Sequence, residues 1–212
     1  MGIRKFAVTP GFGEGGTVFT AQQMAVLGSA VGQEALIELT TFKQLYVAVE
    51  EEELEEVQAR LQAAGLEIHP AGFYTKSLIT CNFCRGAEDA GLETAKKLDG
   101  VIAGHPVPSP LRIGYAGCAL GTSEPLLKDI AVVKMKERFD VYVGGETKGL
   151  KAVLARLLIA GVREEELEPI VMGLITIFQE EGKKKEKFSK FIDRISLATL
   201  REAANRKLRH HT

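Results

Sequence analysis

Hydrophobic positions recur at helical spacing in two stretches of the first third of the chain. In EEELEEVQARLQAAG, the apolar residues Leu54, Val57 and Leu61 fall on one face of a helix whose first turn is acidic. Further upstream, Thr20 has Gln23 three residues later, which is the pattern of a capping box at the start of a helix. This part of the chain is therefore predicted to contain two helices.

Between these helices, β-branched and aromatic residues dominate. The stretches EALIELTT and QLYVAVE have the content that favours strands. Residues 1–16 are rich in glycine, which predicts an arm or an extended strand. Residues 17–70 are thus expected to form a compact α+β unit in the order helix, strand, strand, helix.

A second unit is expected to begin with the strand KSLIT. Further strands are predicted in LRIGYAG, KDIAVVKM and FDVYVGG, while the three prolines of HPVPSP predict a rigid loop that cannot join a strand ladder. One helix is predicted in GAEDAGLETAKKLDG. Three more are predicted in the tail: EEELEPIVMGLITIFQEEG, EKFSKFIDRIS and SLATLREAANRKLRHH.

The composition narrows the class of protein. The chain has 212 residues, 45% hydrophobic content and a formal net charge of −1, so no basic surface for nucleic acid is expected. No apolar run approaches the roughly 18 residues of a membrane-spanning helix, and the first residues lack the apolar region of a signal peptide. Three cysteines are an odd number, which favours reduced thiols and predicts a cytoplasmic protein that uses them for a metal or for catalysis.

The three cysteines form two small groups. TCNFCRGAEDAG contains Cys81 and Cys84, and GYAGCALGTSEP contains Cys118. Each group follows a predicted strand and has glycines beside it, which lets backbone N–H groups approach the sulfur atoms. Spacing alone leaves four interpretations open: buried cysteines that only pack, a zinc knuckle, a redox-active Cys-x-x-Cys pair, and an iron–sulfur cluster.

A longer pattern adds to the spacing. Four stretches follow one another along the chain: GLETAKKLDG, LRIGYAGCALGTSEPLLKDIAVV, FDVYVGGETKG and EEELEPIVMGLITIFQEEGKKKEKFSKFIDRIS. From about Lys76 to Ser196, this order resembles the sirohaem and [4Fe–4S] domain of the nitrite/sulfite reductase family. The first unit is similar to the family's ferredoxin-like half domain. The resemblance implies an α+β fold, with a ferredoxin-like half domain and N-terminal arm in residues 1–75. A mixed-sheet sirohaem/iron–sulfur domain with C-terminal helices would occupy residues 76–212.

The resemblance also implies two cofactors, a [4Fe–4S] cluster and a sirohaem. Cys81, Cys84 and Cys118 are the expected cluster ligands, and Gly117 and Gly121 are expected to lie against the cofactors. Full-length members of the family carry two such halves, with the cofactors between them. This chain resembles a single half, so it is expected to form a homodimer.

The cysteine pattern departs from that of the family. The family binds its cluster through Cys-x5-Cys and Cys-x3-Cys, whereas this chain has only two residues between Cys81 and Cys84. In the second pair, Thr122 stands where the family has the cysteine that bridges the cluster to the sirohaem iron. A threonine hydroxyl does not ionise near pH 7. The fourth iron would therefore be open, or would be completed by Thr122, by Glu124, by water or by another chain.

Three basic residues fall at or next to positions where the family's motifs place cations near the cofactor. They are Lys43 in TTFKQ, Arg85 directly after the first cysteine pair, and Arg112 before the second cysteine group. Sulfite and nitrite are anions, and their reduction needs protons as well as electrons. The resemblance therefore implies catalytic roles for these residues in binding the oxyanion and supplying protons.

Two functions stay open. The resemblance implies an oxidoreductase that depends on sirohaem and an iron–sulfur cluster, takes electrons from a ferredoxin-like donor and reduces sulfite or nitrite. The alternative is a non-catalytic protein of the same fold that serves electron transfer, redox sensing or tetrapyrrole binding. Thr122 favours the alternative, as does Pro110, which stands where the family has the first lysine of a Lys-x-Lys motif.

Overall fold

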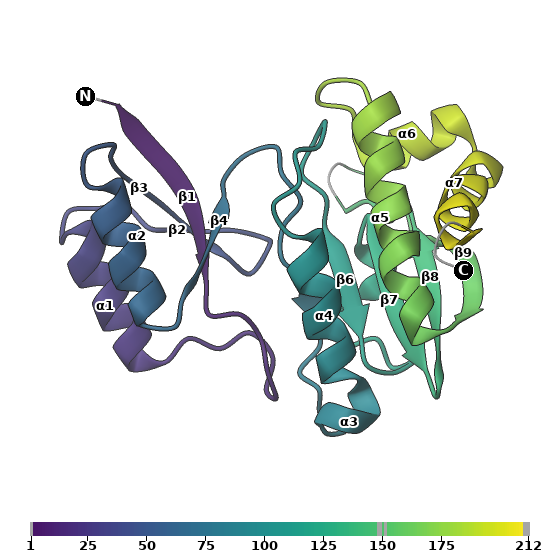
Figure 1. The fold of residues 1–212 in the computed structure, drawn as a ribbon, viewed down its shortest axis with the longest axis horizontal. Helices are drawn as coiled ribbons and strands as arrows, with labels where there is room; N and C mark the ends of the chain where they lie inside the picture. The colour runs from purple at the N-terminus through teal and green to yellow at the C-terminus, as the bar shows by residue number, and fades with distance from the viewer. Residues whose placement is uncertain (1, 148–149, 151, 210–212) are drawn as a thin grey trace.

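The computed structural model describes residues 2–147, 150 and 152–209, which fold into two units (Figure 1). The first unit has the element order βαββαβ: β1 (Ile3–Thr9), α1 (Ala21–Val31), β2 (Glu38–Leu39), β3 (Leu45–Glu50), α2 (Leu54–Ala63) and β4 (Glu67–Pro70). Its strands pair antiparallel in the order β2-β3-β1-β4. The two helices lie side by side on one face of this sheet (Figure 1), where Leu27 and Leu61 are fully buried.

The second unit is a five-stranded sheet with helices on one face. Its elements are β5 (Ile79–Thr80), α3 (Ala87–Ala90), α4 (Leu92–Ile102), β6 (Ile113–Ala116), a 3₁₀ turn η1 (Pro125–Leu127), β7 (Ile130–Met135), β8 (Arg138–Val143), β9 (Arg156–Val162), α5 (Glu164–Glu181), α6 (Phe188–Ile195) and α7 (Leu197–Arg209). The strand order is β5-β6-β7-β8-β9, parallel from β5 to β7 and antiparallel from β7 to β9. Figure 1 shows α4 and α5 in front of this sheet.

These observations confirm the predicted fold class. The first unit has the ferredoxin-like order of elements, the second sheet is mixed, and three helices follow it. The capping box is also confirmed, because the Thr20 hydroxyl accepts the Gln23 N–H at 3.1 Å and the Gln23 side chain accepts the Thr20 N–H at 3.0 Å. The division of the chain between residues 75 and 76 stays a prediction. It falls between the last strand of the first sheet and the first strand of the second.

The helix predicted in GAEDAGLETAKKLDG is divided in two by Gly91. This residue has a left-handed backbone with φ of +70°, and a Cβ atom there would lie 2.4 Å from the Tyr115 hydroxyl. That hydroxyl donates to the carbonyls of Ala90 and Gly91, at 2.9 and 3.0 Å. Because only glycine tolerates both the backbone angle and the close approach, the helix is interrupted and Tyr115 ties α3 to β6.

The sequence pattern does not predict two edge strands, β4 and β9. The four residues of β4 end in Pro70, which has no N–H to donate and is tolerated because the strand lies at the sheet edge. Strand β9 contains Gly161 and pairs with β8 through two register shifts, so its alternation of buried and exposed residues is broken.

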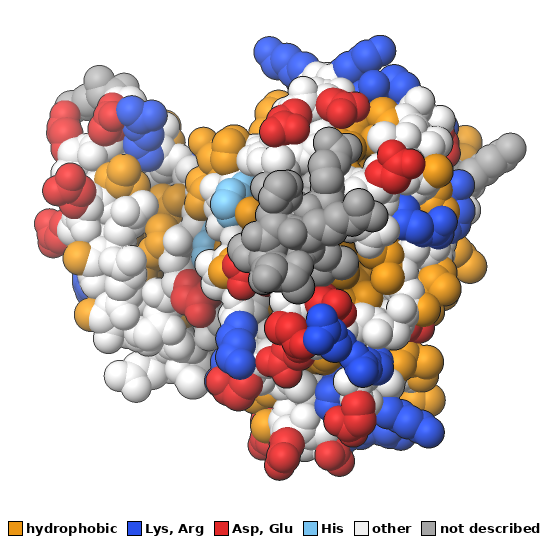
Figure 2. All heavy atoms as spheres, turned by 45° about the vertical axis from the view of Figure 1, so that its right-hand side comes forward, with side chains coloured by type: hydrophobic (Ala, Val, Ile, Leu, Met, Phe, Trp, Pro, Cys, Tyr) orange, Lys and Arg blue, Asp and Glu red, His pale blue; other side chains and the backbone are white. Residues whose placement is uncertain are grey.

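Charge on the surface is mixed. Figure 2 shows acidic and basic side chains interspersed on the face that it presents. Among the residues described, no helix is long and apolar enough to span a membrane.

Asp99 joins α4 to the start of the second sheet. Its carboxylate accepts the Leu78 N–H at 2.6 Å, just before β5, and its side chain is largely buried. Burial raises the pKa of Asp99 to about 6, although the hydrogen bond from Leu78 opposes this shift. The carboxyl group therefore favours the neutral form more strongly in the folded protein than in the unfolded chain.

This shift predicts a pH-dependent loss of stability. Between about pH 4 and pH 6 the folded state binds the extra proton, so the free energy of unfolding should fall as the pH rises through this window. Asp99→Asn keeps an oxygen to accept the Leu78 N–H and removes the titration. Relative to wild type, it should be more stable at pH 7 by up to about 3 kcal/mol and little changed at pH 4.

Urea unfolding at a series of pH values measures the effect. Asp89→Asn, at an exposed position on α3, is the matched control. Parallel pH profiles for wild type and Asp99→Asn would contradict the assignment.

Candidate iron–sulfur site

The parallel pairing of β5 with β6 brings the two cysteine groups to the same edge of the second sheet. Thr80 lies opposite Tyr115 in the register of the two strands. The ladder continues for one more step, because the Cys81 N–H donates to the Tyr115 carbonyl at 3.1 Å. Cys118 follows the end of β6 by two residues. Cys81 and Cys118 therefore leave the sheet from neighbouring strand ends.

Gly117 allows the two cysteine loops to approach each other closely. Its N–H donates to the Cys81 sulfur at 3.3 Å. A Cβ atom at Gly117 would lie 2.5 Å from the Ala90 Cβ and 2.8 Å from the Ala90 carbonyl oxygen. Glycine is thus required at this position, and its backbone is free to supply a hydrogen bond of the kind that stabilises a ligating thiolate.

The loop from Cys81 to Cys84 is held by the aromatic ring between them. Phe83 is 2% exposed and has a left-handed backbone with φ of +50°. Its ring stacks on Tyr115 at 6.1 Å between centroids and on Phe12 at 6.0 Å. All three cysteines are free thiols; Cys81 is buried, Cys118 is half-buried and Cys84 is exposed.

The loop after Cys118 forms a tight turn. The Gly121 N–H donates to the Cys118 carbonyl at 3.2 Å, and the Glu124 N–H donates to the Gly121 carbonyl at 2.8 Å. Gly121 has a φ of +60°, a backbone angle that favours glycine. Thr122 is exposed in this turn, and Glu124 forms an ion pair with Lys128 at 3.6 Å.

Two of the three predicted basic residues lie at the first cysteine loop. Lys43, in the loop before β3, donates from its ammonium group to the Thr80 carbonyl at 3.0 Å, one residue before Cys81. Arg85 directly follows Cys84 and is exposed. The first unit therefore contributes one cation to the edge of the second sheet that carries the thiols.

Arg112 is held by acidic residues instead. It is 8% exposed, and its guanidinium lies 3.4 Å from the Asp129 carboxylate and 3.8 Å from that of Glu146. The backbone N–H of Arg112 also donates to Asp129, at 2.8 Å, and the guanidinium donates to the Thr147 hydroxyl. Internal carboxylates thus already neutralise this cation. Catalytic roles for Lys43, Arg85 and Arg112 stay predictions.

The arrangement of the thiols bears on the kind of metal group they could hold. Across residues 2–147, 150 and 152–209, no three side chains of His, Cys, Asp or Glu converge well enough to hold a single metal ion. A [4Fe–4S] cluster presents four separate irons, so its ligands need not converge on one point. Cys81 and Cys118 follow neighbouring strand ends, Cys84 lies three residues beyond Cys81, and the Gly117 N–H donates to the Cys81 sulfur, an arrangement whose donor set suits such a cluster.

An apolar hollow of about 410 Å³ lies beside the turn that follows Cys118. That turn contributes Leu120 to its wall, and the outer face of the sheet contributes Val133, Met135 and Tyr142. Leu120 is 74% exposed, and Leu154, at the same hollow, is 60% exposed. Apart from Glu124, the side chains that line this hollow beside the Cys118 turn are largely apolar.

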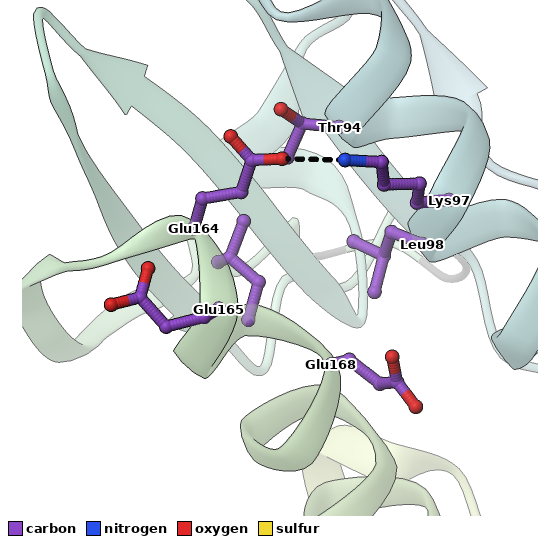
Figure 3. Close-up of a pocket in the computed structure, with 7 residues that line it drawn as sticks. Thr94, Lys97, Leu98, Glu164, Glu165 and Glu168 are labelled. Atoms are coloured by element: carbon purple, nitrogen blue, oxygen red, sulfur yellow. Dashed lines mark hydrogen bonds and ion pairs between the residues drawn. The ribbon is translucent and has the colours of Figure 1, made fainter.

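A second hollow, of about 310 Å³, lies between α4 and the start of α5 (Figure 3). Its walls carry three glutamates and Lys97, which forms an ion pair with Glu164 at 3.4 Å. The acidic side chains are exposed, and none of the three cysteines lines this hollow. This hollow has no part in the candidate site.

Comparison with known proteins shows the family of this chain. Residues 76–212 match the family described as "Nitrite and sulphite reductase 4Fe-4S domain". The match covers more than half of the chain, and the chain therefore belongs to this family.

Two curated relatives differ in length and in named activity. A cobalt-factor III methyltransferase of Priestia megaterium is 28% identical over 195 residues, which are 91% of this chain and 35% of that protein. The chain thus spans about a third of this relative. An assimilatory-type sulfite reductase of Nitratidesulfovibrio vulgaris is 21% identical over 170 residues, which are 79% of this chain and 78% of that protein.

Solved structures share the fold at low sequence identity. Dissimilatory sulfite reductase I has a TM-score of 0.73 and 12% identity, with 96% of this chain and 69% of that chain covered. The Mycobacterium tuberculosis NirA protein has a TM-score of 0.68 and 14% identity, with 97% of this chain and 40% of that chain covered. These similarities extend over both units, whereas the family match begins at residue 76.

The geometry of Arg112 predicts a structural role for its charge. Arg112→Ala would leave the Asp129 carboxylate buried without its cation and would remove one of the cations paired with Glu146, so the free energy of unfolding should fall by about 3 kcal/mol or more. Arg163→Ala removes an exposed guanidinium that pairs with Glu165 and Glu166 and should lower the free energy of unfolding far less, because solvent screens exposed ion pairs. Chemical denaturation followed by circular dichroism compares the two. Equal losses would show that the Arg112 ion pairs do not stabilise the fold.

Proposed function

We propose that this chain is an iron–sulfur electron-transfer domain that holds a [4Fe–4S] cluster on Cys81, Cys84 and Cys118 next to a sirohaem-type tetrapyrrole. The observation that carries the proposal is that Cys81 and Cys118 follow the ends of the paired strands β5 and β6, with the Gly117 N–H donating to the Cys81 sulfur. When bound, such a cluster supplies one-electron transfer. Membership of a 4Fe–4S domain family supports the same assignment.

The protein residues around the thiols have distinct tasks in this proposal. Cys81, which is 7% exposed, anchors the buried side of the cluster, and the Gly117 N–H stabilises its thiolate. Cys84, which is exposed, and Cys118, which is half-buried, would hold the more exposed irons. Thr122 and Glu124 are the candidates near the fourth iron, and Glu124 is already paired with Lys128, which holds it in the turn.

The apolar hollow beside the Cys118 turn is the proposed tetrapyrrole site. Flat macrocycles bury large apolar faces, and the wall formed by Leu120, Leu126 and Met135 offers such a surface next to a cluster ligand. Gly121 and Thr122 lie in the turn that borders this hollow. The sirohaem expected from the family would therefore lie against the outer face of the second sheet.

Reduction of sulfite or nitrite is the second candidate function. It is supported by the sulfite reductase relative, because the match covers 79% of this chain and 78% of that protein. Lys43 and Arg85 would then bind the oxyanion, and electrons would come from a ferredoxin-like donor in the cytoplasm. Against it stand the internal ion pairs of Arg112 and the methyltransferase relative, whose named activity is not a reduction.

Anaerobic reconstitution with iron, sulfide and sirohaem tests the assignment. We expect four irons and four sulfides per chain, and a sirohaem absorption band in addition to the broad absorbance of the cluster. Oxidation of a reduced viologen dye that depends on added sulfite or nitrite would establish the second candidate. Protein that binds zinc and no sulfide would exclude both candidates.

Single substitutions should separate the ligands. Cys81→Ser, Cys84→Ser and Cys118→Ser should each lower the iron and sulfide content, because each thiol is the sole protein ligand to one iron. Thr122→Cys should be tolerated and should slow the loss of iron to a chelator, since it restores a fourth thiolate. Thr176→Cys, which adds a thiol on α5, is the control and should change neither quantity. Full iron and sulfide content in all three serine variants would disprove the ligand assignment.

A second copy of the chain is the proposed partner. The hollow and its surroundings expose Leu120, Met135, Leu154 and Leu157, which a second copy would cover while closing the tetrapyrrole site. Sedimentation at micromolar concentration should give a dimer, and the double variant Leu120→Glu/Leu154→Glu should give a monomer. Leu36→Glu, at a 92% exposed leucine of the first unit, should leave the dimer intact. A stable wild-type monomer would count against this partner.

A further inference from the structure

Residues 10–16, which follow β1, form a short turn that we call the N-terminal strap. The turn is closed by two backbone hydrogen bonds between Gly13 and Gly16, at 3.1 and 2.9 Å. It starts from β1, an interior strand of the first sheet, and packs against the first cysteine loop of the second unit. The strap therefore connects the rigid part of one unit to the loop that carries Cys81 and Cys84.

Three separate contacts hold the strap on this loop. The Phe12 ring stacks on Phe83 at 6.0 Å with planes only 10° apart. The Gly15 N–H donates to the Asn82 carbonyl at 3.0 Å. The Glu14 carboxylate accepts the Ala87 N–H at 2.9 Å, directly beyond the loop. Together they constrain both the residues between the cysteines and the chain that leaves them.

The loop has a conformation that needs such support. A phenylalanine with φ of +50° is strained, because a side chain on an L-residue crowds the backbone in the left-handed region. In this conformation the Phe83 ring stacks with two others, those of Phe12 and Tyr115. Tyr115 is fixed by its hydrogen bonds to α3, so Phe12 supplies the contact that comes from outside the second unit.

We infer that the strap positions the cysteine pair, with Phe12 and Glu14 as positioning residues. By holding Phe83 in the left-handed conformation, the strap keeps Cys81 buried against Gly117 and sets the direction in which Cys84 leaves the loop. Loss of the strap contacts opens the loop, exposes the Cys81 thiol and weakens the binding of any group held by the thiols. The effect on a bound cluster rests on the function proposed above, whereas the effect on thiol exposure does not.

The alkylation rate of each thiol in the metal-free, reduced protein gives the first test. Iodoacetamide labelling resolved by mass spectrometry should show Cys81 reacting about two to ten times faster in Phe12→Ala than in wild type, the factor that one aromatic contact supports. Cys118 in the same molecule is the internal reference. Phe73→Ala removes a 43% exposed ring outside the described aromatic pairs and should leave the Cys81 rate unchanged.

Glu14 gives an independent test that does not depend on the fold surviving the loss of a large side chain. Glu14→Ala removes the acceptor for the Ala87 N–H and should raise the Cys81 rate, whereas Glu14→Gln keeps an acceptor oxygen and should restore the wild-type rate. An unchanged Cys81 rate in folded Phe12→Ala or in Glu14→Ala would overturn the inference. So would an equal rise in Glu14→Gln, since that would make the charge and not the hydrogen bond responsible.

Iron release from the reconstituted protein extends the test to the cluster. Phe12→Ala should lose iron to a chelator faster than Phe73→Ala by a similar factor. If wild type assembles no cluster, the proposed function fails while the alkylation result still decides on the strap. If the cluster forms and the two variants release iron equally, the strap does not position its ligands.

Discussion

The parallel hydrogen bonding between β5 and β6 is the constraint on which the candidate site depends. These strands are short, with two and four residues, yet their register decides which residues leave the sheet together. Parallel strands end at the same edge, so two cysteine groups that are more than thirty positions apart in the chain become neighbours. Gly117 then brings the backbone of one loop onto the sulfur of the other.

The helix-covered face of the sheet supports this edge. Tyr115 lies in β6 between the two cysteine loops, with its ring against Phe83 and Phe139 and its hydroxyl on the break between α3 and α4. Burial raises the pKa of the Tyr115 hydroxyl above its usual value, so this group stays a neutral hydrogen-bond donor. One side chain thus fixes a strand, a helix junction and a cysteine loop at the same time.

Most of the helices and strands, although not β4 and β9, could be predicted from local patterns because those patterns have a short range. The Thr20–Gln23 capping box spans four residues, and the thiols lie next to recognisable strands and glycines. The contact of Phe12 with Phe83 could not be predicted in this way, because it depends on how two units meet. The one local signal was Phe83 itself, an aromatic residue enclosed between two cysteines.

Arg112 shows a related limit of sequence reasoning. Its position next to a cysteine group is visible in the sequence, but its partners Asp129 and Glu146 come from two later segments of the chain. A basic residue near a cofactor motif and a basic residue in an internal ion pair have the same local pattern. Only the packing of these segments distinguishes them, since the difference lies in which carboxylates are buried beside the guanidinium.

The strap also has a consequence for how this fold can be inherited. The stretch recognised by the family begins at residue 76, but a ring that covers its first cysteine loop comes from residue 12. A gene fragment that encoded the second unit alone would lack that ring. It would also lack the hydrogen bond that the Lys43 ammonium donates to the Thr80 carbonyl. Recombination at the boundary between the units would therefore separate residues that act together, which favours passing the two units on as one evolutionary module.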